Sequence, residues 1–162
     1  MILDMKKFLV IAAAMLLVCI SAQAQRESVK YGSAGVITHI NDTHDLHPGI
    51  GLAYGFRNYN RDAFVSFAYG AEAFGFWLPS ASYRSVGIYA IPQIGVAIGP
   101  SGFKVYPHTG FMAGYSTDYG RFNTGSNSGI AIEFGEHIGI DFSAYYIFGQ
   151  AWTTAVNFVW RF

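Results

Sequence analysis

The last eleven residues of the chain alternate between bulky apolar side chains and small or polar ones. The segment 152–162 reads W-T-T-A-V-N-F-V-W-R-F. One parity carries the large apolar side chains and a single threonine: Trp152, Thr154, Val156, Phe158, Trp160 and Phe162. Successive side chains of a β-strand point to opposite faces, so this run predicts a strand with one aromatic, apolar face. A strand of this length with such a face is typical of a barrel wall that contacts lipid.

The same alternation recurs along the chain after residue 25, where no helical periodicity is sustained. Eight runs are predicted to be strands: 29–38, 49–58, 63–77, 85–98, 103–115, 125–134, 138–148 and 152–162. Short connectors such as 99–102 alternate with longer polar ones at 39–48, 78–84 and 116–124. An even strand number with short turns at one end and longer loops at the other is the layout of an outer-membrane barrel. The predicted fold class is all-β, an eight-stranded antiparallel up-and-down transmembrane β-barrel.

Sorting each predicted strand by parity separates the ionisable side chains from the large apolar ones. In the seventh run, for example, Ile140 and Phe142 lie on one face and Asp141 on the other. If the apolar face meets lipid, a polar network lines the barrel interior: Lys30, Arg57, Glu72, Gln93, Lys104, His108, Glu133, Asp141, Asn157 and Arg161. Buried charges need partners, so we expect the cations and carboxylates of this network to pair.

The third run does not sort cleanly, because Phe74 and Phe76 share the parity of Glu72. A bulge near Gly70 or Gly75 would switch the phase of the strand at that point.

Two prolines and the small residues of the first run leave the register open at other places. Pro92 and Pro107 lie inside predicted strands and lack the N–H that a ladder needs, so each is predicted to mark a bulge. In the first run, Lys30 alone assigns the inward face, because glycine and alanine dominate the rest.

The N-terminus has the parts of a secretory signal peptide: two lysines at 6–7, an apolar run over 8–20 and an Ala-Gln-Ala cleavage motif at 22–24. Residues 1–24 are therefore predicted to be a cleaved signal peptide, and residues 25–162 to form the barrel domain. The single cysteine, Cys19, falls inside the signal peptide, so the exported domain is predicted to rely on no disulfide.

Composition agrees with a membrane-embedded sheet. Charged residues make up 12% of the chain and aromatic residues 17%, whereas a soluble domain carries about 25% charged residues. The formal net charge is zero, which argues against a nucleic-acid partner. A soluble lipocalin-like barrel is the competing fold, and it would place the apolar face inside.

The outward aromatic residues are predicted to form two girdles, as membrane interfaces favour. The girdle near the outer end would contain Trp77, Tyr115, Tyr146, Phe148 and Trp152. The girdle near the inner end would contain Tyr31, Phe56, Phe103, Phe134, Trp160 and Phe162.

With these features, the chain resembles the small eight-stranded outer-membrane proteins of Gram-negative bacteria, of the OmpX, OmpA and OmpW type. The resemblance implies location in the cell outer membrane, among outer-membrane lipids and lipopolysaccharide, most simply as a monomer. It also implies that the C-terminal residues Val156, Phe158, Trp160 and Phe162 are the signal read by the barrel-assembly machinery. Members of the group have structural, adhesive, pore-forming or lipid-modifying roles, so the fold does not settle the function.

The interior allows three functions. Eight strands enclose a space that side chains can just fill, which favours a hydrogen-bonded polar core and a structural or surface-interaction role. A narrow solute pore is possible if the interior glycines leave room. An outer-leaflet lipid-modifying enzyme, a lipid A deacylase or acyltransferase, would need a nucleophile beside a base. Ser143 and His108 both point inward, but one strand separates theirs, so we expect no catalytic residue and no cofactor.

Two outer loops carry other candidate contacts. The first contains three histidines and two aspartates that are suitable ligands for zinc, copper or nickel: His39, Asp42, His44, Asp45 and His47. A solvated polar loop explains the same residues, because their spacing matches no established metal site. The segment 116–123 has tyrosine, arginine and asparagine, which suit protein or glycan contact and equally suit a loop beside lipopolysaccharide.

Overall fold

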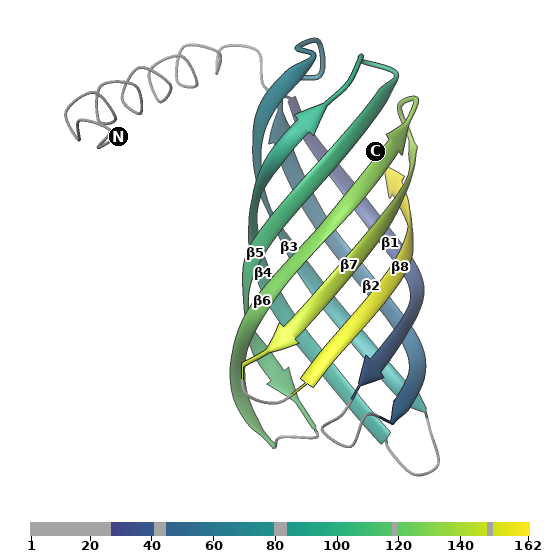
Figure 1. The fold of residues 1–162 in the computed structure, drawn as a ribbon, viewed down its shortest axis with the longest axis vertical. Helices are drawn as coiled ribbons and strands as arrows, with labels where there is room; N and C mark the ends of the chain where they lie inside the picture. The colour runs from purple at the N-terminus through teal and green to yellow at the C-terminus, as the bar shows by residue number, and fades with distance from the viewer. Residues whose placement is uncertain (1–26, 41–44, 80–83, 118–119, 149–150) are drawn as a thin grey trace, which may run out of the picture.

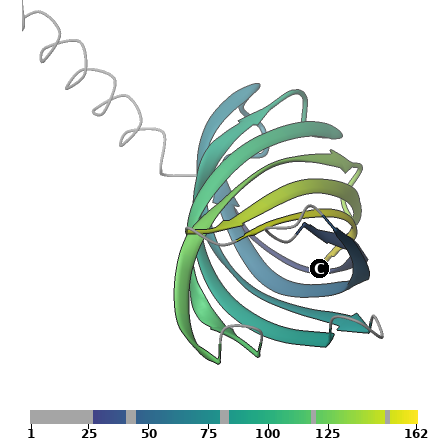
Figure 2. The ribbon, with the colours of Figure 1, turned by 60° about the horizontal axis from the view of Figure 1, so that its bottom comes forward.

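Eight antiparallel strands form one closed barrel in the computed structural model, which describes residues 27–40, 45–79, 84–117, 120–148 and 151–162 (Figures 1 and 2). The strands are β1 Glu27–Ile40, β2 Leu46–Tyr59, β3 Val65–Pro79, β4 Arg84–Ile98, β5 Phe103–Ser116, β6 Arg121–Phe134, β7 Ile138–Ile147 and β8 Ala151–Arg161. Each strand pairs with the next, and β1 pairs with β8 to close the sheet. The predicted eight-stranded antiparallel up-and-down barrel is therefore confirmed.

The two ends of the barrel are distinguished by the connections that lie there. Residues 60–64, 99–102 and 135–137 connect strands at the end where β1 begins and β8 ends, the top of Figure 1. We call this the turn end and the opposite one the loop end. Gly99 (φ 128°) and Gly135 (φ 56°) have positive φ angles that favour glycine in tight turns. The chain closes at this end, where the Phe162 N–H donates to the Lys30 carbonyl at 3.0 Å.

The predicted contrast between long loops and short turns is wrong. The β1–β2 ladder continues to the pair Ile40 and Leu46, and β3 and β4 pair as far as Pro79 and Arg84. Half of the residues of the three predicted loops therefore belong to strands, which leaves 41–45, 80–83 and 117–120 between them. Polar residues near the loop end are compatible with strand structure here because several of them point into the barrel mouth.

Large apolar side chains cover most of the outer surface of the barrel. Half or more of the side chain is exposed at Leu52, Ile88, Phe111 and Phe158, and a bilayer would cover such an area. The predicted girdle residues Trp77, Tyr115, Phe148 and Trp152 are exposed near the loop end. Phe56, Phe103, Phe134, Trp160 and Phe162 are exposed near the turn end. Within the described residues, no helix is long and apolar enough to cross a membrane.

The phase predicted for β1 is wrong by one residue. Lys30 is exposed, whereas Tyr31, assigned to the inner girdle, is buried inside the barrel. The phase is set by Tyr31, Ile37 and His39, which share one parity and are all buried. Lys30 is the fourth residue of β1, close enough to the turn end for its amine to reach water. It therefore does not belong to the interior network.

The predicted bulges are also wrong. β3 pairs residue by residue with β4 from Val65 to Pro79, so Phe74 and Phe76 stay on the inward face with Glu72. The β4–β5 register is the same on both sides of each proline. Pro92 and Pro107 are exposed on the outer face, and ladder pairs are missing beside them. A missing N–H thus interrupts the hydrogen bonds of the ladder without adding a residue.

Candidate functional site in the barrel interior

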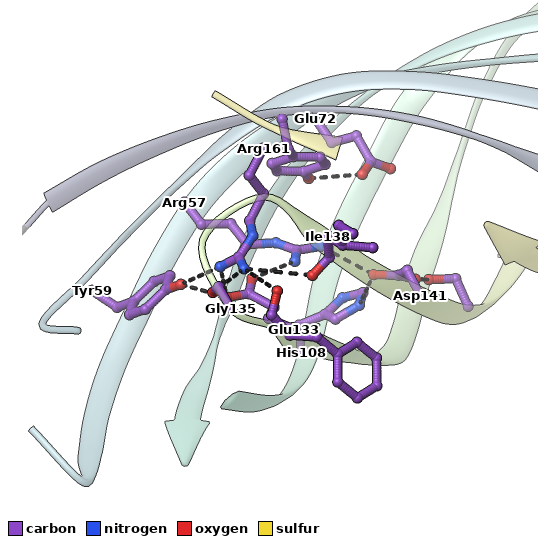
Figure 3. Close-up of polar contacts among 12 residues, drawn as sticks. Arg57, Tyr59, Glu72, His108, Glu133, Gly135, Ile138, Asp141 and Arg161 are labelled. Carbon is purple, nitrogen blue, oxygen red and sulfur yellow. Dashed lines mark hydrogen bonds and ion pairs between the residues drawn. The ribbon is translucent and has the colours of Figure 1, made fainter. Parts of the chain in front are cut away.

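A network of buried charges crosses the interior near the turn end (Figure 3). Arg57 of β2 donates through Nη1 to Glu133 Oε1 of β6 at 3.3 Å and through Nη2 to Asp141 Oδ2 of β7 at 3.0 Å. Arg161 of β8 donates through Nη1 to Glu133 Oε2 at 2.6 Å. We call these two arginines and two carboxylates, with His108, the charge network. Its arginines and carboxylates balance, as buried charges require.

Other donors and acceptors add to the network. Arg161 Nη2 donates to the Gly135 carbonyl at 2.7 Å, and the Tyr59 hydroxyl donates to Glu133 Oε2. The Arg57 guanidinium lies between the rings of Tyr31 and Tyr106, at 4.4 and 4.6 Å from their centroids. Stacked aromatic faces attract a desolvated cation, so these rings hold Arg57 at the centre of the barrel.

Four more predicted interior residues are buried, and two of them, Glu72 and Lys104, have hydrogen-bond partners of their own. The Tyr31 hydroxyl donates to Glu72 Oε2 at 2.8 Å. Lys104 Nζ donates to the carbonyls of Ala63 and Gly99 at 2.6 and 2.5 Å, so it binds turn backbone rather than a carboxylate. Asn157 is buried opposite Asp141 in the β7–β8 ladder. Gln93 is buried too, and its amide has no hydrogen-bond partner among the described residues.

An apolar plug fills the loop-side half of the interior, directly beyond these polar residues. Its members form one buried cluster: Ile37, Phe74, Phe76, Leu78, Tyr89, Ile91, Met112, Tyr145, Ile147 and Ala155. The rings of Phe74 and Tyr145 stack at 4.3 Å between centroids, and those of Phe76 and Tyr89 at 6.2 Å. The polar core predicted from the sequence therefore occupies only part of the barrel, and packed apolar side chains close the rest.

Large rings lie flat against the wall where the opposing residue is glycine. Phe76 of β3 faces Gly87 of β4, and a Cβ on Gly87 would lie 2.6 Å from Phe76 Cζ. Tyr31 of β1 faces Gly55 of β2 in the same way, with a Cβ only 2.8 Å from the Tyr31 hydroxyl. Glycine at these positions thus provides the space that the plug and the network need.

Replacing Gly87 by alanine is expected to lower the free energy of unfolding by about 1–3 kcal/mol, because the new methyl group overpacks the Phe76 ring. Gly75→Ala is a matched control, since a Cβ there points outward and meets only the Gly87 carbonyl at 3.6 Å. Urea titration of both variants in detergent micelles measures the difference. Equal stability of the two variants would show that Phe76 does not need the space at Gly87.

Ser143, Asp141 and His108 meet in the interior, which strand separation alone did not predict. His108 Nε2 lies 3.2 Å from Asp141 Oδ2, and the Ser143 hydroxyl donates to Asp141 Oδ1. Gly129 of β6, the strand between them, has no side chain to keep Ser143 and His108 apart. Both groups bind the carboxylate rather than each other, whereas a catalytic serine needs the base at its own hydroxyl. The three residues therefore extend the charge network and lack the order of a triad.

The histidines of the predicted first loop occupy different places. His39 and His47 are buried directly opposite each other at the loop ends of β1 and β2. Asp45 is exposed next to β2, and Asp42 and His44 lie outside the described residues. In the part of the chain that the structure describes, no three histidine, cysteine, aspartate or glutamate side chains gather as metal ligands.

The sequence prediction missed the tyrosines of the network. Tyr31 was assigned outward, and Tyr59 lies one residue beyond the strand predicted over 49–58. Tyr106 shares the parity of Lys104 and His108, but its position over Arg57 depends on packing across the barrel. The parity of Tyr59 with Arg57 is the one sequence signal that extends the strand to it.

Solved structures similar to this chain include two natural barrels. The attachment invasion locus protein Ail of Yersinia pestis, solved with the heparin analogue sucrose octasulfate, has a TM-score of 0.51 at 16% identity, over 84% of this chain and 99% of Ail. Neisserial surface protein A, NspA, has a TM-score of 0.54 at 10% identity, over 84% of this chain and 97% of NspA. No protein-family model and no curated protein matches the chain.

The closed eight-strand topology and these neighbours define the fold class of the chain. The chain has the fold of the small eight-stranded outer-membrane β-barrels of the OmpX-like kind, as the sequence resemblance implied. At such low identities the likeness concerns the fold alone, so function must be argued from the interior and the surface of this chain.

Proposed function

We propose that the protein is a non-enzymatic integral protein of the cell outer membrane, with a structural or surface-interaction role at its loop end. The observation that carries this proposal is the filled interior. The charge network occupies the turn side, and the apolar plug occupies the loop side. A barrel packed in this way gives solutes no polar path, and the apolar outer face suits a lipid environment. The surfaces left for interaction are the two ends.

The names of the structural neighbours support the surface role. Ail is an attachment protein by name, and NspA is named a surface protein. Because β1 begins and β8 ends at the turn end, export from the periplasmic side would leave the loop end outside. The barrel-assembly machinery, lipopolysaccharide and outer-membrane lipids remain the proposed partners, with the exposed Val156, Phe158, Trp160 and Phe162 as the assembly signal and a monomer as the proposed state.

Labelling single cysteines in intact cells tests the proposed orientation. Arg84 is exposed at the loop end and Glu136 is exposed at the turn end. An impermeant maleimide is expected to label Arg84→Cys in intact cells, and Glu136→Cys only after the outer membrane is permeabilised. Labelling of Glu136→Cys in intact cells, or of neither variant in any fraction, would contradict the proposal.

Two further measurements separate the competing functions. Single-channel recording of the purified barrel is expected to show no opening, because the plug is continuous. Mass spectrometry of lipid A is expected to show the same species with and without expression of the protein, because Ser143 and His108 are bound to Asp141. Regular openings would favour the narrow pore, and altered lipid A acylation would favour the enzyme.

A further inference from the structure

Polar side chains line the inside of the loop end, although the interior just below them is apolar. They are buried within three residues of the loop ends of six strands: His39, His47, Ser85, Ser116, Asn123 and Thr153. We call this group the outer vestibule. Leu78 and Ile147 of the apolar plug lie at the same level, and Ile37 of the plug is the next buried side chain below His39 on β1. A ligand that enters the outer vestibule therefore has polar groups around it and no route onward.

We propose that the outer vestibule binds a divalent transition-metal ion, Cu²⁺ or Zn²⁺, through the imidazoles of His39 and His47. The two residues are direct partners in the antiparallel β1–β2 ladder. Directly opposed residues place their Cβ atoms about 4.5–5.5 Å apart on the same face, close enough for both rings to reach one ion. Both side chains are buried, which keeps their rings on the inward face of the mouth.

The hydrogen bond of His39 prepares one of its nitrogens for a metal. His39 Nδ1 lies 2.8 Å from the Thr153 hydroxyl of β8. When Nδ1–H donates to Thr153 Oγ1, the lone pair is on Nε2, and the hydroxyl fixes the tautomer and the direction of the ring. Metal-binding histidines in general use their second nitrogen in this way. Thr153 is thus a positioning residue for the proposed site.

The ligand chemistry selects the metal. Neutral imidazole suits copper, zinc and nickel, whereas calcium and magnesium require several oxygen ligands. Among the described side chains, no group of three or more ligands gathers, so the proposed site has two protein ligands there, His39 and His47. With so few protein ligands, affinity should follow the general order for divalent ions, in which Cu²⁺ binds more tightly than Zn²⁺ or Ni²⁺. Because the apolar plug lies below the site, we expect the barrel to bind the ion at its mouth and not to transport it.

Titration of the full-length refolded barrel in detergent micelles with CuSO₄ and ZnCl₂ tests the site, by calorimetry and by electron paramagnetic resonance of the bound Cu²⁺. The expected stoichiometry is one ion per barrel, with two nitrogen ligands in the copper spectrum. Thr153→Val should weaken binding about 10–100-fold by freeing the His39 ring, the usual effect of losing such an orienting partner. His39→Gln and His47→Gln should each weaken it at least as much.

Two control variants decide where an ion binds. His137 is exposed in the turn between β6 and β7, so His137→Gln should bind as the wild type does. His44→Gln should also retain one ion per barrel. Unchanged binding in His39→Gln or His47→Gln would overturn the proposal, as would loss of binding in His44→Gln alone. The electrophoretic shift between boiled and unboiled samples shows that each variant is folded. A folded surface barrel without a bound ion would overturn this inference and leave the proposed function intact.

Discussion

Replacing Glu133 by glutamine is expected to lower the free energy of unfolding by about 3–5 kcal/mol, the usual cost of removing one partner from a buried ion pair. Glu133 is 2% exposed and receives hydrogen bonds from Arg57, Arg161 and Tyr59. Glutamine keeps the size of the side chain but removes its charge. Arg161 then keeps only neutral acceptors, such as the Gly135 carbonyl, deep in the barrel. Denaturant unfolding in micelles or lipid vesicles measures the loss.

Glu136→Gln is the matched control, because Glu136 is exposed in the turn three residues away. We expect it to unfold like the wild type, since surface charges contribute little. A double variant, Glu133→Gln with Arg161→Gln, should recover part of the stability, because it also removes the uncompensated cation. If the Glu133 and Glu136 variants unfold at the same denaturant concentration, the charge network does not stabilise the barrel.

Phe74→Ala is expected to lower the free energy of unfolding by a similar amount, about 3–5 kcal/mol, which is the range for deleting a buried aromatic side chain. Phe74 is 1% exposed and packs its ring on Tyr145 in the apolar plug. Phe111→Ala removes the same atoms from the outer face, where half of the side chain is exposed. We expect a much smaller loss for Phe111→Ala, because lipid replaces the lost contacts. The same denaturant titration compares the two variants.

Single-channel recording adds an independent measurement on Phe74→Ala. The cavity left in the plug is expected to allow brief openings that the wild type does not show. If Phe111→Ala costs as much stability as Phe74→Ala, and neither variant opens, the plug is not what closes the barrel.

The alternation of apolar and polar residues predicted the strands, because the face on which a side chain lies follows from its position along the strand. In β7 and β8, the order of apolar and polar residues placed Phe142, Asp141 and Phe158 on the faces where the structure has them. The same rule failed where both faces carry large apolar residues. A rule that assigns large side chains to the lipid face places Phe74 and Phe76 outside. Both are inside, because interior glycines such as Gly87 make room for their rings.

The partners inside the barrel depend on distances that no local pattern contains. Arg57, Glu133 and Asp141 could each be assigned inward from parity, yet their pairing joins β2, β6 and β7 across the interior. The inward prediction for Lys30 is wrong for a different reason, because a charged side chain near the turn end can reach water from the outer face. His39 and His47 fall in the polar segment predicted as a connector, whereas the structure places both inside the polar mouth of the barrel as members of β1 and β2.

Collision rates of nitroxide spin labels with oxygen test the central claim most directly, namely that the bulky apolar parity faces lipid and the polar parity faces the interior. Labels are placed one at a time at Val156, Asn157, Phe158 and Val159 of β8 in a barrel reconstituted in lipid. We expect high oxygen accessibility at 156 and 158 and low accessibility at 157 and 159, because oxygen concentrates in acyl chains and the interior is packed. Equal values at all four positions, or the opposite alternation, would contradict the orientation of the whole barrel wall.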